Sequence, residues 1–419
     1  MVRMTSRERL RKAIHHEQPD RPPLDLGSTL VTGIQASAYA RLKRALGITG
    51  GAVRVYDPYQ MLAEVEDSVK KALGVDTFGI QLPTNFFGYR NENWKPFRMF
   101  DGTEVLVPGK FEYDVLPNGD IVQYPKGDRG ARPSGRMPQG GFYFDSIVRQ
   151  EPIDEARLDP KEWVAQTYSL YTEEELRFLE ETSRRWFEES DYGLLGNFWG
   201  AGFGDIAVVP GPAVLEPKGI RDPEEWYVSS IARKPYVKEI FHLQFELQMK
   251  NLALYREAVG DRIDVVVMSG TDFGSQNGPF ISPDAYRELF KPLHKAMNDW
   301  VHGHTGWKTF YHTCGSIVAY LDDFAEAGVD ILNPVQISAA GMSPEFLKQR
   351  YGERFVFWGG AIDVQHTLTF KTAPEVREEA RRNTAIFGAG GGFVFNNVHN
   401  IQATVPVENI LALLQSVTA

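Results

Sequence analysis

Residues 308–328 read KTFYHTCGSIVAYLDDFAEAG, and this stretch contains the repeating unit on which the fold depends. Its opening residues are aromatic and β-branched, which is typical of a strand buried on both faces in a parallel sheet. After Gly315 the apolar side chains recur at the spacing of an amphipathic helix. The stretch therefore predicts one strand followed by one helix.

The same unit recurs along the chain. Apolar runs at 263–270, 355–363 and 392–400 precede helical patterns at 282–300, 373–388 and 406–416. In total we expect eight strands, at residues 22–26, 77–82, 193–198, 263–269, 308–312, 330–335, 355–359 and 392–397. Eight such units without a long linker predict an α/β fold of the (β/α)8 barrel type, forming one domain over residues 1–419. A doubly wound open sheet is the alternative.

Residues 86–147 interrupt this rhythm, because they are rich in glycine, proline and aromatic residues. Asp101-Gly102 and Asn118-Gly119 are hairpin signals within them. The segment is predicted to be a small β insertion after the second strand. It could form a lid or a partner-docking surface at the catalytic face, or it could be an insertion without a functional role.

The composition limits the classes of partner and the compartment. With 45 basic and 55 acidic residues the net charge is −10, and no long basic run is present, so nucleic acid and anionic membranes are not expected partners. The charged N-terminus and the lack of any apolar run of transmembrane length predict a cytoplasmic protein. A single cysteine, Cys314, agrees with a reducing compartment and leaves a free thiol to explain.

Active sites of (β/α)8 barrels are built at the carboxyl ends of the strands, so polar residues just after each predicted strand are the candidates. They are Asn197, Asp272, Gln276, His312, Cys314, Asn333, Gln336, Asp363, Gln365, Asn396, Asn397, His399 and Gln402.

The sharpest of these features is the pair His312 and Cys314 at one strand end, because imidazole and thiolate together suit zinc. A catalytic zinc takes three protein ligands and keeps a fourth position open. His399, after the last strand, is the leading third ligand, and Asp272 and Asp363 are the oxygen alternatives. A buried cysteine is also often core, and His399 could instead brace its loop.

Several longer motifs resemble the uroporphyrinogen decarboxylase superfamily, specifically its zinc methyltransferase branch that exchanges methyl groups with corrinoid proteins. They are residues 5–9 with 17–23, SGTDFGSQNGPFISP at 269–283, HTCG at 312–315, GGAID at 359–363, and residues 390–402 with 406–410. The resemblance spans nearly the whole chain and implies a (β/α)8 barrel.

In that branch the resemblance implies zinc held by a His-x-Cys pair and a distant cysteine after the final strand. Here the distant cysteine is missing, and His399 takes its place. Similar members demethylate methoxylated aromatics with acidic ligands, which makes Asp363, and Glu378 more weakly, rivals of His399. The decarboxylase branch implies an arginine-bearing motif near the N-terminus, whereas residues 27–32 read GSTLVT.

We therefore expect a zinc-dependent methyltransferase of the corrinoid-dependent O-demethylase type. The methyl group would move between a small methylated compound, best an aryl methyl ether, and cobalamin carried by a partner protein. Phe198, Trp199, Phe203 and Tyr311 would form aromatic walls for the substrate, while Asp272, Gln276, Asn333 and Asn397 would orient it or carry protons. A uroporphyrinogen-type decarboxylase and a non-catalytic ligand-binding barrel are the alternatives, and a homodimer stays open.

Overall fold

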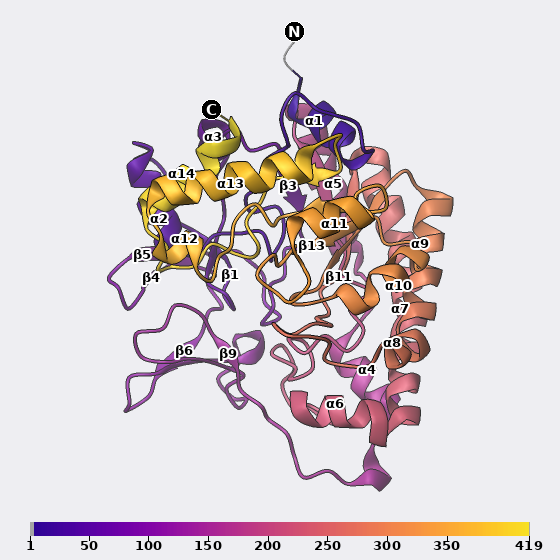
Figure 1. Ribbon diagram of the computed structural model, residues 1–419. Coiled ribbons are helices and arrows are strands. Elements are labelled where there is room, and N and C mark those ends of the chain that lie inside the picture. Colours follow the sequence, from indigo (N-terminus) through magenta and orange to yellow (C-terminus); the bar gives the residue numbers. More distant parts are fainter. Residues whose placement is uncertain (1–3, 419) are drawn as a thin grey trace.

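The centre of the fold is a curled parallel sheet (Figure 1). The computed structural model describes residues 4–418, and within them this sheet has seven strands. They are β3 (Thr77–Ile80), β10 (Gly193–Asn197), β11 (Val265–Ser269), β12 (Lys308–His312), β13 (Ile331–Asn333), β14 (Val356–Trp358) and β15 (Phe393–Val394). Neighbours in the sheet follow chain order, whereas a doubly wound sheet reverses its order at a switch point. The predicted α/β fold with a barrel-like parallel sheet is thus confirmed.

The predicted first strand, residues 22–26, forms a single bridge instead of a strand. Leu24 pairs in parallel with Phe395 just after β15, and the Asp76 amide just before β3 donates to the Leu24 carbonyl at 2.8 Å. Pro22 and Pro23 carry no N–H, so the ladder cannot extend toward the N-terminus. The segment nevertheless makes hydrogen bonds with both edges of the seven-stranded sheet.

Side chains of the sheet alternate between its inner face and the helices outside. The inner cluster is apolar and is formed by Leu195, Val265, Val267, Phe310, Ile331, Val356, Trp358 and Val394, together with Leu10 and Ile14. These last two belong to α1 (Ser6–Ile14), which covers the amino-terminal end of the strands (Figure 1). Only the carboxyl ends of the strands are therefore free to form a site.

The remaining helices form the outer layer, and many begin at a capping residue followed by proline, as at Ser282-Pro283 and Asp222-Pro223. They are α2 (Ala36–Ala45), α3 (Asp67–Leu73), α4 (Pro160–Thr167), α5 (Glu173–Glu189), α6 (Pro223–Ala232), α7 (Lys234–Val259), α8 (Pro283–Leu289), α9 (Lys291–His304), α10 (Leu321–Glu326), α11 (Pro344–Tyr351), α12 (Thr367–Phe370), α13 (Ala373–Gly388) and α14 (Val407–Thr418). Within residues 4–418, none of the helices has both the length and the apolar character that crossing a membrane requires.

Between β3 and β10 the chain forms short antiparallel sheets at one side of the main sheet (Figure 1). One pairs β4 (Lys95–Arg98) with β5 (Glu104–Val107), and another runs through β6 (Tyr113–Val115), β7 (Ile121–Gln123), β8 (Gly135–Met137) and β9 (Asp145–Ser146). Upstream of β3, β1 (Val55–Asp57) pairs with β2 (Leu62–Ala63). The assignment of residues 86–147 as an insertion into a single domain stays a prediction.

Asp76 connects α1, the Leu24 bridge and β3, and the fold predicts a large cost for losing it. Its fully buried carboxylate lies 2.6 Å from Arg9 Nη1 and 2.7 Å from Arg21 Nη1, and it accepts the Leu24 amide at 2.8 Å. Asp76→Ala would remove one of the two carboxylate partners of the buried Arg9 guanidinium and the side-chain acceptor of the Leu24 amide, so we expect the free energy of unfolding in urea to fall by about 3–5 kcal/mol.

Asp299 gives the matched control for that experiment. It pairs with Lys295 at 2.9 Å on the exposed surface of α9. Asp299→Ala should cost only about 0.3–0.5 kcal/mol, as exposed pairs one helical turn apart do. Equal losses in the two variants would contradict the role of Asp76.

Candidate metal centre

The loop after β12 brings polar side chains to the carboxyl end of the sheet. His312 ends β12 and shares its side of the sheet with Phe310 of the inner cluster, because one residue separates the two. Gly315 then turns the chain with a φ of +84°, which glycine adopts at no steric cost. A Cβ at this position would lie 2.2 Å from the Gly274 carbonyl oxygen. The loops after β11 and β12 can therefore pack this closely only with glycine at position 315.

Three potential metal ligands, His312, Cys314 and His399, converge beside this turn. One ligand atom from each lies within 4.8 Å of the others, and Cys314 Sγ is 3.4 Å from His312 Nε2. Two ligands bonded to a tetrahedral zinc at about 2.1 and 2.3 Å lie roughly 3.6 Å apart. The His312–Cys314 pair thus has the spacing of zinc ligands. If the trio held zinc, its two nitrogens and one sulfur would leave open the fourth position that catalytic zinc sites keep.

Burial keeps this trio uncharged. It lowers the pKa of His312 to about 4 and that of His399 to about 3, so both imidazoles are neutral near pH 7 and can bind a metal. Burial, and then the charge of Asp272, raises the pKa of the Cys314 thiol above its usual range. A metal that binds here must therefore displace the thiol proton, as metal binding to cysteine generally does.

Two carboxyl groups lie next to the trio. Asp272 Oδ1 accepts the Cys314 amide at 2.6 Å and is 3.9 Å from His312 Nε2, so it orients the loop that carries the thiol. Burial raises the pKa of Asp272 and, with the charge of Asp272, raises the pKa of Asp205 to about 7. Asp205 is not among the residues predicted from the sequence. Its only signal is that it is the first carboxylate after β10.

The structure brings other predicted residues into different roles. Asp363 is the acidic rival of His399, but its carboxylate accepts the Gln365 amide at 2.7 Å and lies 2.8 Å from His366 Nδ1. It is not brought into the trio. Gln276 is exposed and braces a neighbouring loop, because its Nε2 donates to the Ser338 carbonyl at 2.6 Å.

Two buried asparagines are also engaged within the protein. Asn333 Oδ1 lies 2.7 Å from His312 Nδ1, and Asn333 Nδ2 donates to the Trp358 carbonyl at 2.8 Å. Asn397 Nδ2 donates to the His399 carbonyl and so holds the backbone of that ligand. Both side chains act on the candidate ligands, whereas contact with a substrate was the expectation.

Three of the four aromatic residues predicted to contact the substrate lie in the outer layer. They do not lie at the carboxyl end of the sheet, which we call the mouth. Tyr311 donates its hydroxyl to Asn298 Oδ1 at 3.0 Å, and Phe198 packs edge-on against Tyr255 of α7. Phe203 is fully buried and packs against Phe241 of the outer helix α7. Trp199 alone packs against the inner cluster, with a left-handed φ of +61°. Strained backbone of this kind recurs at functional sites.

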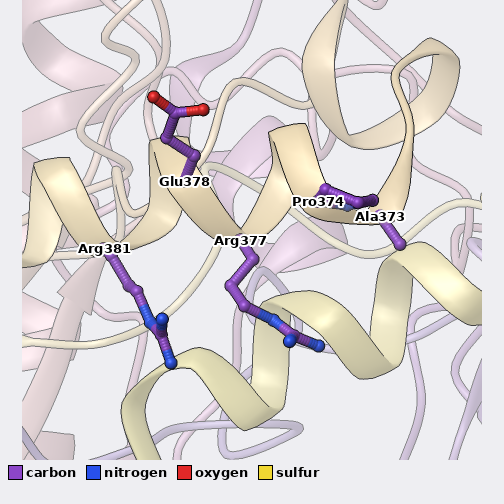
Figure 2. A pocket seen from close by; sticks show the side chains of 5 residues that line it. All are labelled: Ala373, Pro374, Arg377, Glu378 and Arg381. Atoms are coloured by element: carbon purple, nitrogen blue, oxygen red, sulfur yellow. The ribbon is translucent and has the colours of Figure 1, made fainter.

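A narrow cavity of about 20 Å³ adjoins Asp272. Its other lining residues are mostly apolar and aromatic and include Trp226 and Tyr227 of α6 and Phe273. A larger groove of about 450 Å³ lies along the outer helix α13 and is lined by Ala373, Pro374, Arg377, Glu378 and Arg381. Glu378 lines this groove and does not belong to the trio. Figure 2 shows it on a different side of α13 from Arg377 and Arg381.

Comparisons with known proteins agree with this fold and these motifs. The family model "Uroporphyrinogen decarboxylase (URO-D)" matches residues 254–419, which confirms the resemblance seen in the sequence over the part that holds all three candidate ligands. A "methyltransferase from Methanosarcina mazei" of known structure superimposes with a TM-score of 0.54 at 16% identity, covering 99% of this chain and 98% of that one. No curated protein sequence matches the chain significantly.

The geometry predicts how zinc binding depends on the disputed third ligand. His399→Ala would remove one of the three candidate ligands, so its zinc affinity should fall by more than the roughly 10–100-fold that outer-shell changes cost. Asp363→Ala should bind zinc as the wild type does. Competition against a chromogenic chelator measures both affinities, and the reverse order would assign Asp363 as the ligand.

Proposed function

We propose that this protein is a zinc-dependent methyltransferase that moves a methyl group between a small methylated compound and a corrinoid protein. The observation that carries the proposal is the trio His312, Cys314 and His399 at the carboxyl end of the sheet. Two histidines and one cysteine suit zinc, and three protein ligands are the arrangement of catalytic sites that bind a further group. The family match over residues 254–419 supports the same reading.

Zinc would supply a Lewis acid to a heteroatom of the substrate, and the corrinoid would supply the acceptor or donor of the methyl group. The protein itself would hold the thiolate in place through Asp272, which accepts the Cys314 amide. Burial and the nearby charge of Asp272 raise the pKa of Asp205 to about 7, so Asp205 can give or take a proton near neutral pH.

An aryl methyl ether is our proposed substrate. The cavity beside Asp272 has a volume of about 20 Å³, and so has room for about one water-sized or methyl-sized group. Trp226 and Tyr227 line it, and Trp199 packs at the top of the inner cluster. The ring of the ether would contact this aromatic lining, and its methyl carbon would have to face the corrinoid partner, because cobalt must approach that carbon from the side opposite the departing ether oxygen.

The charges near the trio argue against a polycarboxylate substrate. Asp205 and Asp272 are both partly buried, and among residues 4–418 no lysine or arginine lies within ion-pair distance of either. A substrate with many carboxylates would find no positive side chain beside these two groups, and burying an unpaired charge is costly. Uroporphyrinogen-type decarboxylation is therefore the weaker interpretation.

The proposal predicts zinc-dependent methylation of free cob(I)alamin by methoxyarenes. The zinc-loaded wild type should show it, while Cys314→Ser and His399→Ala should fall at least about 100-fold, because a ligand of the Lewis acid is lost. The change in the cobalamin absorption spectrum measures the rate. His302→Gln is the control, since His302 pairs with Asp330 at 2.7 Å at the start of β13, opposite the mouth.

Two outcomes would overturn this function. One is a Cys314→Ser rate equal to that of the wild type. The other is conversion of uroporphyrinogen by zinc-free protein, which would restore the decarboxylase interpretation. Inactivity with methoxyarenes but activity with methylamines or methylthiols would reject only the aryl ether.

A further inference from the structure

Asn333 occupies the position beside His312 in the parallel sheet. It ends β13, pairs in register with His312 of β12, and is fully buried. Its main-chain carbonyl accepts the Thr313 amide at 2.7 Å, so its backbone also holds the segment between the two β12-loop ligands. Both ends of its side-chain amide are engaged, one with the Trp358 carbonyl and one with His312.

These partners determine which way the Asn333 amide faces. A peptide carbonyl can only accept a hydrogen bond, so the atom 2.8 Å from the Trp358 carbonyl oxygen must be Nδ2. Oδ1 then faces His312 Nδ1 at 2.7 Å, and an amide oxygen also only accepts. His312 Nδ1 must therefore carry the proton.

The neutral imidazole has one proton, so protonation at Nδ1 leaves Nε2 with a free lone pair. His312 Nε2 is the atom that lies 3.4 Å from Cys314 Sγ. The lone pair consequently points to the place where His312 and Cys314 can share a metal. The alternative tautomer would place a hydrogen there and leave Asn333 Oδ1 buried without a donor, which costs about 1–3 kcal/mol.

We propose that Asn333 is a positioning residue. Its hydrogen bond to the Trp358 carbonyl fixes which way its amide faces, and its Oδ1 then selects the His312 tautomer that can bind a metal through Nε2. The inference rests on the proposed function for the identity of the metal. The tautomer itself is a property of the metal-free protein, so the two can fail separately.

Asn298 provides a matched control. It is fully buried, its Oδ1 accepts the Tyr311 hydroxyl at 3.0 Å, and its Nδ2 donates to the Ala327 carbonyl at 2.8 Å. The amide thus links a side-chain donor to a main-chain carbonyl as Asn333 does. Tyr311 is adjacent to His312 in sequence but lies on the opposite face of β12. Asn298→Leu should reproduce the loss of packing and hydrogen bonds without touching the candidate ligands.

The first test needs no variant. In full-length metal-free protein labelled with ¹⁵N-histidine, two-bond nitrogen–proton correlation spectra report the tautomer of His312, assigned by the signal missing from His312→Gln. We expect the form protonated at Nδ1. Protonation at Nε2 in the wild type would overturn the inference, whether or not the protein binds zinc.

The second test compares Asn333→Leu with Asn298→Leu. In Asn333→Leu we expect His312 to lose its single tautomer and zinc affinity to fall about 10–100-fold, the range for outer-shell partners of metal-bound histidines. Asn298→Leu should keep both at wild-type values. Equal zinc affinities in the two folded variants, with His312 still protonated at Nδ1, would overturn the inference. If Asn333→Leu does not fold, the wild-type tautomer decides the question.

If wild-type protein binds no zinc but shows the Nδ1-protonated tautomer, the proposed function fails and the positioning role of Asn333 stands. If it binds zinc with His312 protonated at Nε2, the proposed function stands and the role of Asn333 fails.

Discussion

The strict alternation of side chains along a parallel strand is the constraint on which this structure depends. In a curled sheet, every second residue faces inward and the others face the helices. On β12 this places Phe310 and His312 on the inner side and Tyr311 among the outer aromatic side chains. On β13 it places Asn333 on the side of His312, with which it is in register. The candidate metal centre is thus the last inward layer above an apolar inner cluster.

The centre is held by links between loops as well as by the strands. Asp272 from the loop after β11 accepts the Cys314 amide, and Gly315 allows these two loops to pack in contact. Asn397 binds the His399 carbonyl after β15. Each candidate ligand is therefore oriented by a polar side chain from the same set of strand ends, which is the support that metal-binding side chains need. Without a metal, both imidazoles are neutral and the thiol is protonated. A cation that binds here would take the place of the thiol proton and balance the charge of the thiolate.

Much of this could be predicted from the sequence. The bounds of β12 are those expected, and the strand-end filter selected His312, Cys314 and His399, because a barrel gathers its strand ends in one place. The motif at residues 17–23 also has a physical basis, since Asp20 and Arg21 join Arg9 and Asp76 in one ion-pair network.

Other features depend on information that motifs do not contain. Phe198 and Tyr311 were expected at the mouth, although alternation from Leu195 and Phe310 places both outside. Asp205 and Phe203 lie in a loop without periodicity, so only the folded chain shows that one carboxylate lies near Asp272 and that the phenyl ring is buried. Asp363 follows a strand, as His312 and His399 do, but its carboxylate makes hydrogen bonds within its own loop, to Gln365 and His366. Sequence position alone cannot distinguish such a turn residue from a metal ligand.

The central claim is that His312, Cys314 and His399 together bind zinc at the carboxyl end of the sheet. X-ray absorption at the zinc edge of the zinc-loaded full-length protein tests it most directly, because sulfur and nitrogen scatter differently and at different distances. We predict one sulfur at about 2.3 Å and two imidazole nitrogens at about 2.0–2.1 Å, with the remaining position taken by a light atom. A shell of nitrogen and oxygen without sulfur, or with a single imidazole, would contradict the account.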